Sequence, residues 1–227
     1  MPGDLCMILV DNSGGGTEVK YWDTVWDKND IEKYRQYIKG YENVKNVMVR
    51  EFQKHNCRVV CDAACGFGAN SLILQSNGFD VWGFDISETS VWITKELLAP
   101  YGIQKERFKT ASLSNTEYQD GFFDAVAVRA AMDHLCVDEF KSALSELQRI
   151  TKANGLLYVS FDPMESDDLE LEHSVLEDGS FLYTDESRNG LLFHYYSDED
   201  IQKAFYGYEI LAMETDGRGN RHLVIRY

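Results

Sequence analysis

The middle of the chain alternates between two hydrophobic patterns. Short apolar runs of the kind that form buried strands lie at residues 58–63, 80–85, 107–111, 122–129 and 152–160. Between them, apolar residues recur at helical spacing at residues 69–77, 87–99 and 138–151. Asn154-Gly155 is expected to end the last of these helices. This alternation predicts an α/β fold with a doubly wound, mostly parallel sheet.

The pattern changes on either side of this middle region. Residues 17–55 are aromatic and amphipathic, with an interruption at Gly40, and are expected to form a helical lid. Residues 209–215 and 221–227 predict an antiparallel hairpin that closes the sheet. The outer segments are therefore expected to extend the central sheet rather than to form separate domains.

A further change comes after the fifth predicted strand. Residues 163–196 hold three short strand-like runs, separated by turns at 177–179 and 188–190. We expect them to form a small β insert on the side of the sheet where ligands bind. Together these patterns predict a single domain over residues 1–227, with a flexible N-terminus at residues 1–16.

The most informative local pattern is a strand, a glycine turn and a helix at residues 58–71. Asp62 stands near the end of the strand, and Gly66 and Gly68 allow the backbone to turn sharply and approach a ligand. The next strand also ends in an acid, Asp85, whose carboxylate can accept two hydrogen bonds from a ribose diol. The arrangement predicts a site for a nucleoside cofactor.

Two cofactor classes compete for such a site. A dinucleotide places a diphosphate on the glycine turn, whereas S-adenosylmethionine brings a cationic amino group and a sulfonium there. The charge of Asp62 would repel the first and attract the second. The dinucleotide pattern also requires a third glycine where this chain has Ser71. The residues therefore favour S-adenosylmethionine and leave a dinucleotide-dependent oxidoreductase as the alternative.

The segment Asp62-Ala-Ala-Cys-Gly-Phe-Gly68 resembles the first motif of class I S-adenosylmethionine-dependent methyltransferases. Ala64 replaces the first glycine of that motif and is expected to fit there with a negative φ. The resemblance continues through later strand ends and covers residues 56–163, at Trp82–Ser87, Thr110–Leu113, Phe122–Arg129 and Lys152–Ser160. It implies a Rossmann-like fold and methyl transfer.

The resemblance also implies which residues contact the cofactor. They follow the ends of the predicted strands: Asp62, Ala64, Gly66, Gly68, Asn70, Asp85, Ile86, Ser112, Leu113 and Arg129. Tyr21, Trp22 and Trp26 are expected either to fold over the cofactor as a lid or to pack as an ordinary amphipathic helix. We count Tyr21 and Trp26 among the cofactor-binding candidates.

The candidate catalytic residue is His134, which follows the fourth predicted strand and is of the residue type that most often acts as a general base. A purely structural role is the alternative. Asp133 beside it and His173, His194 and Tyr195 in the insert are candidates for contact with the substrate. Ordinary packing of the insert is the competing interpretation for these last three.

Charge narrows the range of partners. The 227 residues carry a net charge of −16, and residues 162–200 hold thirteen acids and one base. A phosphate backbone would be repelled, so nucleic acid is not an expected substrate. The acidic stretch predicts either solubility or attraction of a cationic or amine-bearing acceptor.

Other features of the sequence bear on location and metals. The chain has no apolar run long enough for a bilayer and no recognisable secretory signal, so we expect a cytoplasmic protein without a membrane partner. Cys57, Cys61 and Cys65 are spaced by four but include strand-like valines, and no metal site is expected. The oligomeric state is left open.

These patterns lead to one expectation about function. The chain is predicted to transfer a methyl group from S-adenosylmethionine to a small-molecule O, N or S acceptor. A dinucleotide-dependent oxidoreductase and a non-enzymatic cofactor-binding domain remain as alternatives.

Overall fold

The computed structural model describes residues 17–227, with side chains from residue 21 onward, so the expected flexible segment 1–16 lies outside the described residues. Its main sheet has the strand order β3-β2-β1-β4-β5-β10-β9. Strands β1 to β5 are parallel, and β10 runs antiparallel to both of its neighbours. The strands are β1 (Val59–Ala63), β2 (Asp80–Asp85), β3 (Phe108–Thr110), β4 (Phe123–Val128), β5 (Thr151–Phe161), β9 (Glu209–Thr215) and β10 (Arg221–Arg226). The predicted α/β class and the closing hairpin are confirmed.

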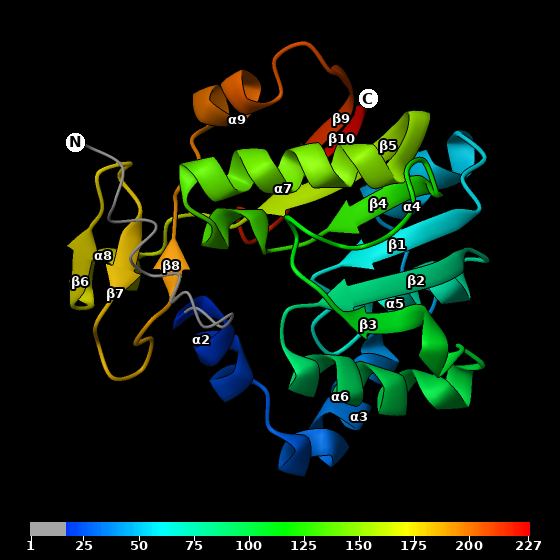
Figure 1. Ribbon diagram of the computed structural model, residues 1–227, viewed down its shortest axis with the longest axis horizontal. Coiled ribbons are helices and arrows are strands. Elements are labelled where there is room, and N and C mark those ends of the chain that lie inside the picture. Colours follow the sequence, from blue (N-terminus) through cyan, green and yellow to red (C-terminus); the bar gives the residue numbers. More distant parts are fainter. Residues whose placement is uncertain (1–16) are drawn as a thin grey trace.

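Helices cover both faces of the sheet (Figure 1). One face packs against α3 (Ile31–Ile38), α4 (Val47–Lys54), α5 (Ala69–Ser76) and α6 (Glu88–Leu98). The other packs against α7 (Val137–Ile150) and α9 (Asp198–Ala204). Neighbouring residues of β1 point to opposite faces, and Val60 and Cys61 are both fully buried, which explains why this strand reads as a continuous apolar run.

The boundary between α7 and β5 differs from the prediction. The helix ends at Ile150, and the strand begins at once with Thr151, whose hydroxyl donates to the Leu147 carbonyl at 2.6 Å. Asn154, with φ of +62°, and Gly155 lie inside β5, where the register with β4 shifts. A Cβ on Gly155 would meet the Thr151 side chain at 2.4 Å. The Asn-Gly pair therefore forms a bulge in the strand and does not end the helix.

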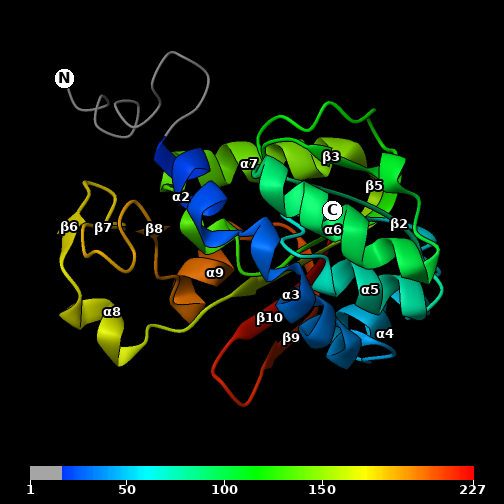
Figure 2. The ribbon, with the colours of Figure 1, turned by 90° about the horizontal axis from the view of Figure 1, so that it is seen from below.

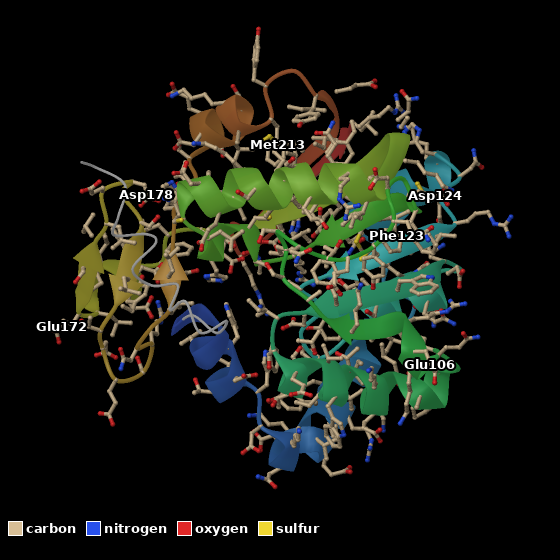
Figure 3. The ribbon with its side chains drawn as sticks, in the orientation of Figure 1. Glu106, Phe123, Asp124, Glu172, Asp178 and Met213 are labelled. Carbon is tan, nitrogen blue, oxygen red and sulfur yellow. The ribbon has the colours of Figure 1, made fainter. Side chains whose placement is uncertain are left out.

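A second, smaller sheet follows β5. It consists of β6 (His173–Val175), β7 (Phe181–Tyr183) and β8 (Leu192–Phe193), which pair antiparallel in that order, and it is preceded by the short helix α8 (Ser166–Glu170). The sheet lies beyond the arrowheads of β1, β2 and β4 (Figure 1). Figure 3 shows Glu172 and Asp178 of this region at the opposite end of the molecule from Glu106 and Asp124.

Helix α2 (Thr17–Val25) lies on the same side as the small sheet, close to β8 (Figures 1 and 2), and contacts α6. The carboxyl ends of the parallel strands thus face α2 and the 163–196 region. Among residues 17–227, no helix combines the length and the apolar character that crossing a bilayer requires. Whether residues 17–55 act as a lid stays a prediction.

Candidate active site

The glycine turn after β1 is held by its neighbours on both sides. Gly66 has φ of +54° and Gly68 has φ of +88°, in the region that favours glycine. The Gly66 N–H donates to Oδ2 of Asp85 at 2.8 Å. Its carbonyl accepts from the hydroxyls of Ser90 at 2.7 Å and Thr94 at 2.5 Å. The terminal acid of β2 and the first turns of α6 therefore fix the conformation of the turn.

Ala64 departs from its predicted conformation. Its φ is +55°, so the expected negative φ is wrong. A left-handed conformation costs a residue with a Cβ roughly 1–2 kcal/mol, which glycine does not pay. Ala130, just after β4, has φ of +48°. Each of the two central strands is thus followed by an alanine in a strained backbone conformation, a feature that occurs at functional sites.

The turn leaves room for no side chain at Gly66. A Cβ placed there would lie 3.3 Å from the ring of Trp26, which comes from the segment after α2. The same ring contacts Tyr34 and Phe67, with centroid distances of 5.9 and 6.2 Å. The close approach explains why glycine is required at this position.

Asp85 lies at the end of β2 and lines the same space. Its Oδ1 accepts from the Ser87 N–H at 3.0 Å, and its Oδ2 accepts from Gly66. Burial raises the pKa of Asp85, and these two hydrogen bonds act against that shift. Each carboxylate oxygen keeps a free lone pair that can accept a further bond from a ligand.

Asp62 lies behind the turn, fully buried and outside the set of residues that line the cavity. The Ser71 hydroxyl donates to its Oδ2 at 2.6 Å, and its Oδ1 has no hydrogen-bond partner among the described residues. Burial raises the pKa of Asp62 to about 7. The full charge that the sequence argument assigned to Asp62 is therefore only partial at neutral pH, and a nearby cation would restore it.

These elements enclose a cavity of about 430 Å³, within the usual size range of small-molecule sites. The lining comes from the turn, the ends of β2, β3 and β4, helix α7 and the segment around α2. Many of the predicted cofactor contacts lie on its wall: Ala64, Gly66, Asn70, Asp85, Ile86, Ser112, Leu113, Arg129 and Trp26. Asp62, Gly68 and Tyr21 do not line it.

Two of these absences have a simple structural reason. Gly68 packs away from the cavity, because a Cβ there would meet Thr94 and Leu98 of α6 at 3.1 and 3.2 Å. Tyr21 lies beside the 163–196 region, because a Cβ placed on Gly190 would lie 3.8 Å from the Tyr21 Cβ. Both residues support the site from behind rather than from its wall.

Asn70 presents an unsatisfied oxygen at the start of α5. Its side chain is buried and lines the cavity, and its Oδ1 has no hydrogen-bond partner among the described residues. A buried acceptor without a donor is uncommon and indicates a place for a ligand donor. Together with Oδ1 of Asp62, it makes this end of the site rich in acceptors.

Helix α2 and the residue after it contribute two aromatic rings to the cavity wall. The ring of Trp22 contacts the ring of His134 edge-on, with a centroid distance of 5.1 Å. Asp23 accepts a hydrogen bond of 2.5 Å from the hydroxyl of Ser87. Trp22 and Trp26 both line the cavity. The helix is thus attached to the site at several points.

His134 lies on the cavity wall in a defined tautomer. Its Nδ1 is 2.9 Å from the Leu192 carbonyl, which can only accept, so Nδ1 carries the proton. In the neutral ring, Nε2 then keeps its lone pair. The side chain is half-buried between Trp22 and Phe193. This geometry suits acceptance of a proton by Nε2.

The other predicted substrate residues do not line this cavity. Asp133 is 1% exposed, and its Oδ2 accepts from the Asp162 N–H at 2.8 Å. His173 stacks on Phe181 with a centroid distance of 4.3 Å. The ring of His194 bonds to Ser180, and Tyr195 lies under the Arg221 guanidinium. These contacts favour packing of the insert, and a substrate role for them stays a prediction.

The sequence missed several lining residues. Tyr41, Ser114 and Glu139 belong to the wall but to no motif, and Phe67 lies inside the first motif but was not among the predicted contacts. Glu139 lies in the first turn of α7, where its Oε2 accepts from the Cys136 N–H at 3.2 Å, and burial raises its pKa. An acid three residues after a helix start is a capping signal that could have drawn attention to it. Nothing in the local sequence points Tyr41 toward this site.

Metal ligands are not gathered in the described part of the chain. No group of three or more His, Cys, Asp or Glu side chains from residue 21 onward is arranged to hold an ion. The thiols of Cys61 and Cys65 are buried, and burial raises the pKa of both.

Comparison with known proteins identifies the central region. Residues 61–159 match the family model described as "Methyltransferase domain". No match was found among curated proteins. The matched segment runs from β1 through β5 and so includes the turn, Asp85 and His134.

Many solved structures share the fold. A S-adenosylmethionine-dependent methyltransferase from Methanosarcina mazei is 18% identical, with a TM-score of 0.64, over 80% of this chain and 97% of its own. One from Clostridium acetobutylicum is 15% identical, with a TM-score of 0.62, over 98% and 94%. Magnesium protoporphyrin IX methyltransferase from Synechocystis, solved with bound cofactor, is 20% identical, with a TM-score of 0.59, over 95% and 99%. At these identities the likeness establishes the fold.

Proposed function

Since this chain belongs to the class I S-adenosylmethionine-dependent methyltransferase superfamily, we propose that it transfers a methyl group from S-adenosylmethionine to a small-molecule acceptor at O, N or S. The distribution of donors and acceptors around the glycine turn carries this proposal. The N–H groups of Cys65, Gly66 and Gly68 are already bonded, to Phe84, Asp85 and Cys65 respectively. A diphosphate would find these three donors occupied.

The same end of the site offers acceptors instead. The free oxygen of Asn70 on the wall and the negative charge of Asp62 behind it fit a ligand that brings N–H donors and positive charge, as the amino group of S-adenosylmethionine does. A cation there would lower the raised pKa of Asp62 and so keep its carboxylate ionised. The residues present therefore fit this cofactor better than a dinucleotide.

The remaining lining residues fit the nucleoside part. Asp85 has lone pairs for the ribose hydroxyls, in line with the position of an acid at the end of a second strand. Ile86 and Leu113 supply apolar walls, and the Ser112 hydroxyl provides a polar contact for a base edge. Trp26 covers the turn from the solvent side.

When bound, S-adenosylmethionine supplies a methyl group that is already activated on its sulfonium. The protein then has to hold and orient the two reactants, exclude water and take up a proton where the acceptor has one. In this proposal, Trp22 excludes water and His134 accepts the proton at Nε2. Glu139 and Ala143 of α7 complete the wall.

The size of the cavity and the charge of the chain both bear on the kind of acceptor. The enclosed cavity is suited to a small molecule, and the net charge of −16 disfavours nucleic acid. The acidic residues between 162 and 200 would attract an amine on the acceptor.

Calorimetric titration of the purified chain tests the cofactor. S-adenosylmethionine is expected to bind and NADH is not, and Gly66→Val is the matched variant that should lose the binding. Preferential binding of NADH would contradict the proposal. Incubation with methyl-labelled cofactor and a pool of small molecules, read by mass spectrometry, then tests transfer. Tight binding without any labelled product would favour a non-enzymatic role.

A further inference from the structure

A second cavity of about 420 Å³ shares a wall with the first. Arg129 and Tyr41 line both cavities. The rest of the second cavity comes from residues 40–50, which include the start of α4, and from α5, β5 and the β9–β10 hairpin. It is large enough for one small molecule, and the family resemblance assigned it no role.

The carboxylates of the second cavity already have hydrogen-bond partners within the protein. Glu214 pairs with Arg50 at 2.6 Å. Asp216 accepts from the N–H groups of Arg218 and Asn220 at 2.8 and 3.0 Å, and from Nδ2 of Asn220 at 2.8 Å. These bonds hold the pKa of Asp216 well below its usual range. Neither acid is left to bind a cationic ligand.

His222 is also fixed by its neighbours. Its Nε2 lies 3.2 Å from Oδ2 of Asp216, so Nε2 carries a proton and donates it. Its Nδ1 lies 2.8 Å from the Tyr158 hydroxyl, which donates to it in the neutral tautomer. The two rings stack with an interplanar angle of 11°. The polar groups of this wall are therefore satisfied, and they present an aromatic surface.

Two cations of the cavity have no such partners. Neither Arg129 nor Lys45 forms a hydrogen bond or ion pair of its side chain with residues 21–227. Arg129 is half-buried, with five N–H donors in a planar fork, and Lys45 is exposed at the rim. In a chain of net charge −16, this cavity is locally cationic. Unpaired donors of this kind indicate an anionic ligand.

We propose that the second cavity holds the methyl acceptor, and that Arg129 and Lys45 bind a carboxylate of that acceptor. This rests on the proposed function, and it identifies the acceptor as a small carboxylic acid with an apolar or aromatic body. A guanidinium matches a carboxylate through two parallel hydrogen bonds. A doubly charged phosphate would need more positive charge than two side chains supply in so acidic a protein. An amine on the same molecule is compatible with the acidic region 162–200.

The position of Arg129 joins this site to the first cavity. Arg129 and His134 both act to lower the pKa of Asp162, whose burial raises it, so the two side chains lie within electrostatic reach of one point. Both also line the first cavity. An acceptor anchored at Arg129 therefore extends toward the proposed proton acceptor.

Binding of a matched pair of probes to the cofactor-free full chain tests the proposal. Benzoate and benzamide have the same shape but differ in charge, and ligand-observed NMR can measure both affinities. Benzoate is expected to bind at least about tenfold more tightly than benzamide. Arg129→Gln should remove most of this preference, Arg129→Lys should keep part of it, and Lys45→Gln should weaken benzoate binding by about threefold.

Lys141→Gln is the control for bulk charge, because Lys141 is exposed, pairs with Asp138 and lies on α7 outside both cavities. It should leave benzoate binding unchanged. Thermal unfolding shows whether each variant folds, and Arg129→Lys serves if Arg129→Gln does not. Equal affinity for the two probes, or an equal loss in Lys141→Gln, would overturn the proposal.

A second titration separates this inference from the proposed function. S-adenosylmethionine is expected to bind Lys45→Gln, whose side chain lines only the second cavity, within about threefold of the wild type. In Arg129→Gln, a loss of cofactor binding with unchanged benzoate binding would assign Arg129 to the cofactor and refute the carboxylate site. If the wild type does not bind S-adenosylmethionine, the proposed function fails, whereas the probe experiment still reports on the second cavity.

Discussion

The two cavities at the carboxyl edge of the sheet are nearly equal in volume but opposite in what they leave unsatisfied. The first exposes or backs onto acceptor oxygens, those of Asn70, Asp62 and Asp85. The second has its acids hydrogen-bonded within the protein and adds an unpaired cation, Lys45, to Arg129, which lines both cavities. The contrast arises within a chain whose overall charge is strongly negative. Local hydrogen bonding, rather than composition, therefore decides what each cavity can bind.

Two aspartates illustrate this difference. Asp216 receives three bonds from its own turn, and its pKa falls. Asp62 receives one from the Ser71 hydroxyl, is fully buried, and its pKa rises to about 7. An aspartate side chain is thus fully hydrogen-bonded in the second cavity, whereas the aspartate beside the first cavity has an oxygen without a partner and would be stabilised in its charged form by a cation.

Gly66→Val is expected to have the largest effect, and on the first cavity alone. The new side chain would meet the Trp26 ring at 3.3 Å or less and would force a β-branched residue to φ of +54°. Cofactor binding should fall by more than about hundredfold. Calorimetry with S-adenosylmethionine, and NMR with benzoate as the control, measure both cavities. Retained cofactor binding would count against the assignment of the turn.

Asp62→Asn tests the raised pKa through stability. An acid whose folded pKa lies above its unfolded value stabilises the fold at low pH and loses that contribution as pH rises toward the folded pKa. From pH 5 to pH 8 the wild type should lose about 3 kcal/mol of unfolding free energy relative to the variant. Denaturant unfolding at both pH values measures this.

Asp124→Asn is the matched control with the opposite sign. The Lys152 ammonium and the N–H groups of Arg58 and Val59 lower the pKa of Asp124 against the effect of burial. Its contribution is therefore lost as pH falls through the acidic range, and not between pH 5 and pH 8. A parallel pH dependence of wild type and Asp62→Asn would refute the raised pKa of Asp62.

His134→Gln tests the proposed general base on the wall of the first cavity. Removal of a general base is expected to lower kcat by about hundredfold for an acceptor that must lose a proton. Cofactor affinity should stay within about threefold. The pH–rate profile of wild type and variant, with an acceptor found in the labelled pool, is the measurement. An unchanged rate and profile would leave His134 with the structural role of bonding the Leu192 carbonyl.

Asp85→Ala should weaken cofactor binding by at least about tenfold. The variant loses the proposed ribose contact and also the bonds from the Gly66 and Ser87 N–H groups. Benzoate binding in the second cavity should not change. Calorimetry that returns an unaltered cofactor affinity would remove Asp85 from the site.

Ala64→Gly is expected to have the smallest effect. Relief of the left-handed conformation outweighs the greater chain entropy of glycine and should raise the unfolding free energy by about 0.5–1 kcal/mol. Ala143→Gly, in the middle of α7, is the control and should lower it. Denaturant unfolding of both variants checks the sign, and a destabilised Ala64→Gly would contradict the strain.

The sequence predicted the sheet well because buried strands and capped helices leave local patterns. The helix cap at Ser87 and the turn at Gly66 are examples, since each depends on residues close along the chain. The φ of Ala64 was not predictable, because it is imposed by the bonds that β2 and α6 make to the next residues. The strand start at Thr151 was missed because the Asn-Gly pair also occurs in bulges.

Long-range placement limited the prediction of the site. Lys45, Arg129, Tyr158 and His222 meet in one cavity although they come from segments spread over most of the chain. The sequence pointed to Arg129 through its motif but gave no sign that it forms a wall between two spaces. The raised pKa of Asp62 could not be predicted either, because burial and the lack of hydrogen-bond partners are properties of the folded protein.

The position of β10 has a consequence for how the molecule is made. The ribosome delivers Glu209–Thr215 before Arg221–Arg226, yet the later strand is the one that joins the earlier strand to β5. Until β10 emerges, the edge of β5 has no neighbouring strand on that side, and β9 has no strand to pair with. A nascent chain of this protein therefore completes its sheet only after residues 221–226 have emerged, and its open strand edge needs protection from aggregation until then.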